Sequence, residues 1–201
     1  MKKGTLAYEI VMTALVLVII AGIAGALLGL VHHFTAVDPN ELLLKKASAI
    51  YDGELKLAPV SEGISAKVEY ENGEMLHTLV PKKDAVTDIF VLHVKGTGAY
   101  KGTVELLVNI TGGKIEKIAK YQANETPGLG SKALEDSYFS QYYGVRITPD
   151  FPGYKLLKTE PSVDTEVRAI SGASKTSTAV TNAVNVAVRW YQNTVLKGGA
   201  R

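Results

Sequence analysis

A string of small and hydroxyl-bearing residues, Ser171-Gly172-Ala173-Ser174-Lys175-Thr176-Ser177, stands near the C-terminus. Apolar residues then recur at helical spacing, so the string is expected to open a long helix that runs to about Leu196. The start of a helix exposes unpaired N–H groups and a partial positive charge, which suit a phosphate group. Because Ser and Thr are also favoured as N-caps, the string predicts either an anion site or a simple helix cap.

Two further strings contain paired glycines. Glu125-Thr126-Pro127-Gly128-Leu129-Gly130 places a carboxylate, a hydroxyl and two glycines around one apolar side chain. Such a loop can lay its backbone against a flat ring, and a structural turn explains the same residues equally well. Gly96-Thr97-Gly98-Ala99-Tyr100-Lys101-Gly102 is expected to join two strands. It is not a dinucleotide-binding fingerprint, because it opens a strand and not a helix, and a wide hairpin would account for it.

Composition excludes several kinds of site. With no Cys among 201 residues, the chain cannot hold a Cys-ligated iron–sulfur cluster, a CxxC haem or a disulfide, so any redox role rests on an organic cofactor. The net charge of +2, without a basic stripe, argues against nucleic-acid binding. The P-loop and the S-x-x-K and G-x-S-x-G patterns of serine enzymes are absent from the sequence. No metal-ligand cluster is expected from the histidines, His32, His33, His77 and His93.

An uncharged segment extends from Ile10 to Val31. As a helix it would be about 33 Å long, against a hydrocarbon core of roughly 30 Å. A signal peptide is the alternative, but the apolar run is too long for a typical one and no clean A-x-A cleavage site follows it. We expect an uncleaved transmembrane helix over residues 10–34, in which Gly25 and Gly29 permit close packing against another membrane helix. Lysine pairs flank both ends, so charge favours an inside N-terminus only slightly.

Beyond this segment the chain is expected to form one α+β domain, with a mainly antiparallel sheet packed against helices. A capped start at Asp38 predicts a helix from Pro39 to about Tyr51, and a polar helix is expected from Ser131 to about Tyr142. Asn72-Gly73 and Thr111-Gly112-Gly113 indicate hairpin turns. The expected strands are Ala66–Glu71, Glu74–Val80, Ile89–Lys95, Thr103–Ile110, Lys114–Lys120 and Glu166–Ile170. The expected organisation is a cytoplasmic segment 1–9, a transmembrane helix 10–34, a connecting helix and linker 35–65, a main domain 66–196 and a tail 197–201.

The chain resembles one family over nearly its whole length. The features that carry the resemblance are, in this order, the apolar segment, G-x-G-x-Y-x-G, E-T-P-G-L-G and S-G-A-S at a helix start. The chain is similar to the FMN-binding G subunit of the Rnf electron-transport complex, whose pattern is shared by the C subunit of the sodium-pumping NADH:quinone reductase. The resemblance implies an FMN joined through a phosphoester to the hydroxyl that closes the S-G-A string, here Ser174. It also implies that a separate flavin transferase attaches this group from FAD.

The same resemblance implies the residues around the flavin. Residues implied to lie at the attachment site are Ser171, Gly172, Ala173, Lys175, Thr176 and Ser177; those implied to lie at the ring are Glu125, Thr126, Gly128, Leu129 and Gly130; Tyr100 is a further implied FMN-binding residue. The chain departs from the family pattern in three places. Ser174 replaces the usual Thr, Arg168 replaces the usual Asp, and Gln122-Ala123 stand where a His often occurs. Thr176 is the alternative acceptor hydroxyl.

The implied function is that of a single-pass membrane protein, with its domain on the periplasmic side, that relays electrons within an ion-translocating ferredoxin:NAD+ oxidoreductase. Flavins can pass one electron at a time, which suits such a relay. The implied partners are the lipid bilayer, other membrane and iron–sulfur subunits, and the transferase. Two alternatives stay open: the C subunit of the sodium-pumping reductase, and an anchored structural or assembly subunit without flavin.

Overall fold

The computed structural model describes residue 4 and residues 6–35, 38–58, 67–83 and 88–198. It divides into two compact units, Met1–Leu42 and Leu43–Arg201. Several expected features lie outside the described residues: the lysine pair at positions 2 and 3, residue 66 of the first expected strand, residues 59–65 of the linker before it, and residues 199–201 of the tail.

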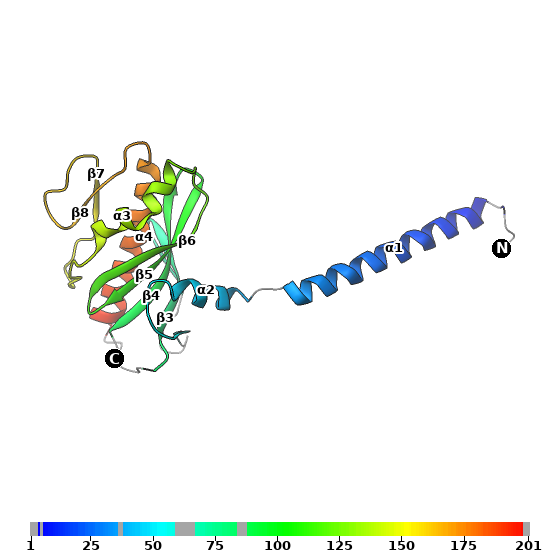
Figure 1. Ribbon diagram of the computed structural model, residues 1–201, viewed down its shortest axis with the longest axis horizontal. Helices are drawn as coiled ribbons and strands as arrows, with labels where there is room; N and C mark the ends of the chain where they lie inside the picture. The colour runs from blue at the N-terminus through cyan, green and yellow to red at the C-terminus, as the bar shows by residue number, and fades with distance from the viewer. Residues whose placement is uncertain (1–3, 5, 36–37, 59–66, 84–87, 199–201) are drawn as a thin grey trace. The chain divides into compact units, whose positions relative to one another are not determined.

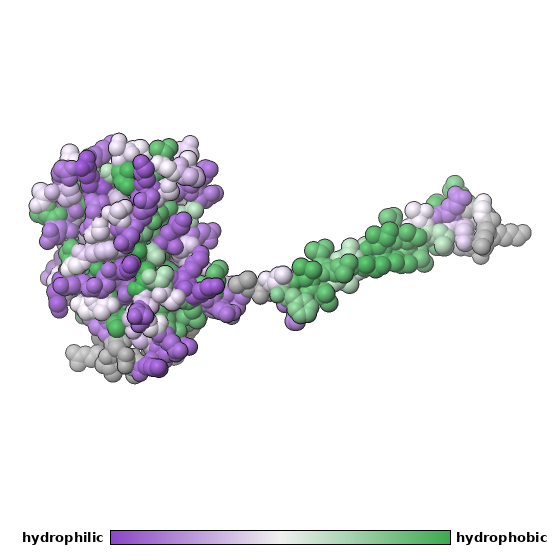
Figure 2. All heavy atoms as spheres, viewed as in Figure 1, coloured by the Kyte–Doolittle hydropathy of each residue, from purple (hydrophilic) through white to green (hydrophobic). Residues whose placement is uncertain are grey.

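The first unit contains the long helix α1, Leu6–Thr35. Its 30 residues would extend about 45 Å, enough to cross a hydrocarbon core. Apolar side chains cover α1 and are exposed along its length, as with Leu28 at 71% (Figure 2). By length and composition, this helix could cross a membrane.

The second unit is built on a six-stranded sheet in which every pairing is antiparallel. Strands β1 and β2 both pair with one edge of β3, and β4, β5 and β6 follow in chain order on its other side. Both predicted hairpin turns are present, between β2 and β3 and between β5 and β6. The strands are β1 (Leu55–Leu57), β2 (Val68–Tyr70), β3 (Gly73–Pro81), β4 (Ile89–Ala99), β5 (Gly102–Thr111) and β6 (Lys114–Ala123).

One face of this sheet is covered by the helix α4, Ser174–Tyr191 (Figure 1). Small and β-branched residues such as Ala183 and Val184 are fully buried on the helix and pack against the apolar side chains of β4 and β5. Gly96 in β4 allows the close approach, because a Cβ there would lie 2.9 Å from the Ala183 Cβ. The α4 helix continues as a π-helical turn, Gln192–Leu196, so the predicted end near Leu196 agrees with the structure.

The opposite face is partly covered by α2, Pro39–Ala47, through Leu43 and Ala47. Asp38 caps this helix, since its Oδ1 accepts a hydrogen bond of 2.9 Å from the Asn40 N–H. The helix is shorter than predicted. It ends at Ala47 and tightens into a turn, in which the Ile50 N–H donates to the Ala47 carbonyl and buries Ile50 against the sheet.

A second, two-stranded sheet is formed by β7 (Lys155–Leu157) and β8 (Glu166–Arg168), which run parallel. The sequence did not indicate β7. β8 falls within the strand expected at residues 166–170 and leads directly into the Ser171 string. This small sheet therefore helps to position the start of α4.

Two local predictions are wrong. The helix expected from Ser131 to Tyr142 is three short pieces, a 3-10 helix Gly130–Leu134, α3 (Asp136–Phe139) and a 3-10 turn Ser140–Tyr142. Extended backbone at Glu135 separates the first two, and this break lets Ala133 and Phe139 both enter the core. The Gly96–Gly102 string joins two strands, as predicted, but it is a tight hairpin and not a wide loop, because β4 continues to Ala99 through a bulge and β5 begins at Gly102. The α+β fold class, with its mainly antiparallel sheet, is confirmed.

Candidate functional site

The fold brings the Glu125 string and the Ser171 string together, although they are far apart in the chain. Thr176 Oγ1 donates a hydrogen bond of 2.8 Å to Glu125 Oε2. Gly130 lies against this pair: a Cβ there would collide with the Glu125 carboxylate and lie 2.9 Å from Thr176 Oγ1. The first and last residues of E-T-P-G-L-G thus enclose the Thr176 side chain.

The two strings also lie close together at their exposed side. Gly172 has a φ of +81°, a left-handed conformation that favours glycine, and a Cβ there would lie 3.7 Å from Leu129 Cδ2. Leu129 itself is 55% exposed. An apolar side chain therefore lies in water beside the start of α4, where it could cover one side of a bound ring.

The start of α4 has no side-chain cap. Ala173 is the N-cap residue, and its side chain makes no capping hydrogen bond to the first helical N–H groups. Alanine is a poor N-cap, and the first turn of a helix leaves its N–H groups without intrahelical partners. The simple-cap interpretation of this string is therefore wrong, and the helix start keeps its capacity to bind an anion.

The four hydroxyl groups of the string differ in their surroundings. Thr176 is 2% exposed and donates to Glu125, and Ser177 is fully buried, with its Oγ accepting a bond of 3.2 Å from the Ile170 N–H. Ser171 and Ser174 are exposed. Ser174 is the first residue of α4, so its hydroxyl lies at the helix start and is accessible to an attacking or binding group.

Two cavities border Ser174. One has a volume of about 540 Å³ and the other about 340 Å³, within the range of small-molecule sites. The larger is lined by Tyr138, Gln141, Lys158, Arg168, Ala169, Ile170, Ser171, Gly172 and Ser174. The smaller is lined by Tyr154, Leu156, Leu157, Lys158, Ala169, Ser174, Thr178, Thr181, Asn182 and Asn185. The two sets share Lys158, Ala169 and Ser174.

The residues expected at the flavin ring lie outside both cavities. Tyr100 is 69% exposed and is connected to the helix start through Lys175, whose Nζ lies 5.7 Å from the centre of its ring. Gly128 has a φ of +78° and donates its N–H to Ser131 Oγ, so the loop around Leu129 is a tight turn. Residues 126–129, Tyr100 and Lys175 are thus exposed near the start of α4, whereas Ser171, Gly172 and Ser174 line the larger cavity.

Sequence reasoning missed Gln141 and Lys158, and it noted Arg168 only as a departure from a pattern. Arg168 forms an ion pair with Glu160, and its N–H donates to Gln141 Oε1 at 2.8 Å. These residues come from the 3-10 turn Ser140–Tyr142, from β8 and from the end of β7. No local spacing in the sequence links them, because only the folded chain brings them around one cavity.

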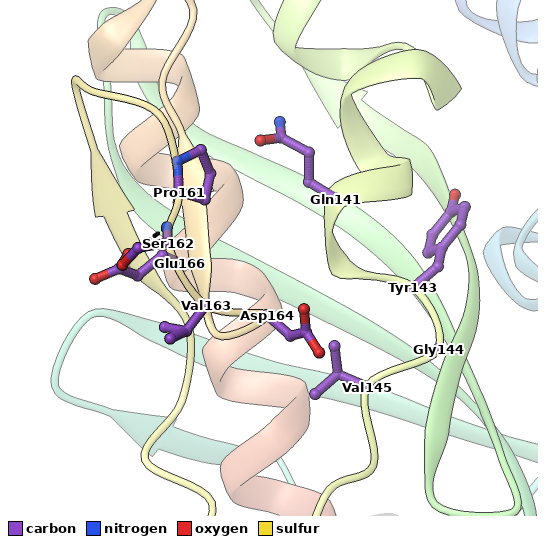
Figure 3. Close-up of a pocket in the computed structure, with 9 residues that line it drawn as sticks. All are labelled: Gln141, Tyr143, Gly144, Val145, Pro161, Ser162, Val163, Asp164 and Glu166. Carbon is purple, nitrogen blue, oxygen red and sulfur yellow. Dashed lines mark hydrogen bonds between the residues drawn. The ribbon is translucent and has the colours of Figure 1, made fainter.

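A further hollow of about 500 Å³ contains none of the predicted site residues (Figure 3). It is lined by Gln141, Tyr143, Gly144, Val145, Pro161, Ser162, Val163, Asp164 and Glu166. Glu166 Oε2 accepts bonds from the N–H and hydroxyl of Ser162, which hold the pKa of that carboxyl below its usual value. In the described part of the chain, no group of three His, Cys, Asp or Glu could hold a metal ion.

Comparisons with known proteins indicate the family of this chain. Residues 99–189 match the FMN-binding domain family, a span that contains both strings and most of α4. The chain is 30% identical over 189 residues to the G subunit of the Na(+)-translocating ferredoxin:NAD(+) oxidoreductase complex of Acetobacterium woodii, covering 89% of this chain and 90% of that protein. It is 35% identical over 120 residues to the G subunit of the proton-translocating ferredoxin:NAD(+) oxidoreductase complex of Clostridium ljungdahlii, covering 59% and 60%.

A more distant relative is the C subunit of the Na(+)-translocating NADH-quinone reductase of Vibrio vulnificus. It is 28% identical over 149 residues, which cover 72% of this chain and 58% of that protein. The resemblance that the two strings indicated is confirmed by the Acetobacterium woodii relative, which matches nearly the full length of both chains. This chain therefore belongs to the family of FMN-binding domain proteins that includes the G subunits of the ion-translocating ferredoxin:NAD(+) oxidoreductase complexes.

Proposed function

We propose that this protein is a membrane-anchored electron carrier whose FMN is bound covalently, through a phosphoester, to Ser174. It would relay electrons within an ion-translocating ferredoxin:NAD+ oxidoreductase complex. The observation that carries the proposal is the position of Ser174: an exposed hydroxyl at an uncapped helix start, where two cavities meet. The two relatives named as G subunits of such complexes support the assignment to the complex.

The residues present fit an FMN group. The uncapped first turn of α4 offers N–H groups and a partial positive charge to a phosphate. Each neighbouring cavity is large enough for part of the ribityl chain or the ring. Thr176 and Ser177 are buried and already hydrogen-bonded, so their hydroxyls are poorly placed for attachment of the flavin phosphate. Ser174 is therefore a better attachment residue than Thr176, the alternative acceptor hydroxyl.

The attachment would proceed by transfer from FAD on a separate flavin transferase. The Ser174 oxygen forms a bond to the phosphorus of the FMN half, the P–O bond of the diphosphate breaks, AMP leaves, and the hydroxyl proton passes to solvent. When bound, FMN supplies one-electron redox chemistry. The chain would hold the group in place: Ser174 would prevent its loss, and the start of α4 would stabilise its negative charge.

The proposed organisation places α1 in the membrane and the domain that begins after it on the periplasmic side. The exposed apolar surface of α1 and the relatives that belong to ion-translocating systems support the membrane position of α1, and the periplasmic side is what the family resemblance implies. Protease added to right-side-out vesicles should digest the chain beyond about residue 34 and leave a protected N-terminal fragment. Complete protection of the domain would place it in the cytoplasm.

The attachment is tested by co-expression of the full chain with a flavin transferase, followed by a denaturing gel viewed under ultraviolet light. Wild-type protein, Ser171→Ala and Thr176→Ala should fluoresce, whereas Ser174→Ala should not. Fluorescence that persists in Ser174→Ala would assign the flavin to another residue. Dark wild-type protein would favour the structural or assembly role. Proteins that co-purify with the chain distinguish the ferredoxin-dependent complex from the sodium-pumping quinone reductase.

A further inference from the structure

One charged residue, Lys158, lines both cavities beside Ser174. The other two residues that the cavities share are Ala169 and Ser174 itself. A group attached to the Ser174 oxygen begins at the point where the cavities meet, whichever of them the rest of the group enters. Lys158 is thus the cation that borders this point in both cavities.

The backbone of the small parallel sheet fixes this position. Leu157 in β7 is in register with Arg168 in β8, so Lys158 and Ala169 follow at the same edge of the sheet. The Ala169 N–H donates a hydrogen bond of 2.7 Å to the Leu157 carbonyl, which extends the register by one residue. Ala169 leads into the loop that starts α4, so the same pairing places Lys158 beside the cavities that Ser174 lines.

The other nearby cations are already engaged. Arg168 also lines the larger cavity, but its guanidinium forms an ion pair with Glu160. Lys175 lies with its Nζ over the Tyr100 ring and lines neither cavity. Within the described residues, the Lys158 ammonium takes part in no hydrogen bond or ion pair. Its charge is therefore available to an incoming anion.

We propose that Lys158 provides the positive charge that faces the flavin phosphate at Ser174, both as the donor arrives and in the attached phosphodiester. This rests on the proposed attachment of FMN to Ser174. A lysine ammonium is a compact charge with three donors on a flexible stem, suited to a phosphate that approaches from different directions. Lys158 is a positioning residue: it attracts and holds the phosphate, and the Ser174 oxygen forms the bond.

The test compares Lys158→Met and Lys158→Arg with a matched control, Lys155→Met. Lys155 is an exposed lysine on the adjoining strand β7, and it lines neither cavity. The initial rate of flavin attachment to the full chain is measured with transferase and FAD, by intact mass, at low and high salt. Lys158→Met should slow attachment about fivefold at low salt, the size expected for one exposed charge pair, and should weaken the salt dependence. The attachment rates of Lys158→Arg and Lys155→Met should both stay near the rate of the wild-type protein.

A second measurement reports on the attached state without using the rate. In fully loaded protein, the phosphorus-31 resonance of the phosphodiester should shift in Lys158→Met and stay in place in Lys155→Met. A wild-type rate together with an unshifted resonance in Lys158→Met overturns the role of Lys158 while leaving the attachment to Ser174 intact. Wild-type protein that accepts no flavin refutes the attachment itself, and the role of Lys158 with it.

Discussion

Thr176 is held by Glu125 beneath the start of α4, and Gly130 leaves just enough room for that bond. The two ends of the E-T-P-G-L-G string thereby have a structural role, and the ring contact that the family resemblance implied stays a prediction. The Glu125 carboxylate accepts a hydrogen bond from the Thr176 hydroxyl, and the exposed Leu129 remains next to Gly172. Glu125 thus links the loop to the helix that carries Ser174.

We predict that Gly130→Ala destabilises the protein by about 1–3 kcal/mol, because the new methyl group collides with the Glu125 carboxylate and crowds Thr176. Urea unfolding, followed by the fluorescence of the buried Trp190, measures the change. The same substitution in a Glu125→Ala background should cost less, because the collision is removed. An equal cost in both backgrounds would show that the methyl group is accommodated elsewhere.

At the scale of elements, features set by local sequence were predictable. The Asn72-Gly73 and Thr111–Gly113 turns, the Asp38 cap and the start of α4 are all present close to their expected positions. Features set by tertiary contacts were not. β7 is three residues long and exists through its pairing with β8, and the break at Glu135 follows from which side chains the core accepts. For the same reason, the spacing of Thr176 and Ser174 in the sequence could not show that the Thr176 side chain is buried and the Ser174 side chain is not.

The β3, β4 and β5 strands carry a chain of titratable side chains on the face away from α4. His77 Nδ1 and His93 Nδ1 lie 3.0 Å apart, and His93 Nε2 lies 3.1 Å from Glu105 Oε2. Tyr121 packs against His93, and Lys46 lies over Tyr121. Burial, followed by the nearby His93, lowers the pKa of His77, and the hydrogen bond with His93 lowers the pKa of Glu105.

Both groups therefore bind fewer protons in the folded protein than in the unfolded chain, and stability should fall with acidification. The contribution of His77 to the free energy of unfolding is fully present above its unfolded pKa of about 6.5, and it is lost as pH falls through its lower folded pKa. The contribution of Glu105 is lost at lower pH, below its unfolded pKa of about 4.3. The urea midpoint of the wild-type protein should decline from about pH 8 to about pH 5, and the midpoint of the His77→Gln variant should decline less over this interval. A His77→Gln profile that parallels wild type would contradict this.

At the scale of the whole molecule, the chain joins an apolar helix to a domain with its own buried core. Gly25 and Gly29 lie on α1, and among the described residues a Cβ added at either position would meet nothing within 4 Å, so α1 itself tolerates larger side chains there. Gly25→Leu with Gly29→Leu should therefore leave the domain folded but reduce co-purification with other membrane proteins of the complex, since close helix approach needs small residues. Val18→Ala with Ile19→Ala is the control. Unchanged yield of the complex would show that these glycines are incidental.

The central claim, that FMN is attached to Ser174, has a direct test in the peptide map of purified, loaded protein. Trypsin cleaves after Arg168 and Lys175, so Ser171 and Ser174 fall in one peptide, and Thr176 and Ser177 begin the next. We predict that the mass of one FMN is carried by the peptide of residues 169–175 and that fragmentation assigns it to Ser174. An FMN on the peptide that starts at Thr176, or on Ser171, would contradict the account, as would both peptides appearing only unmodified.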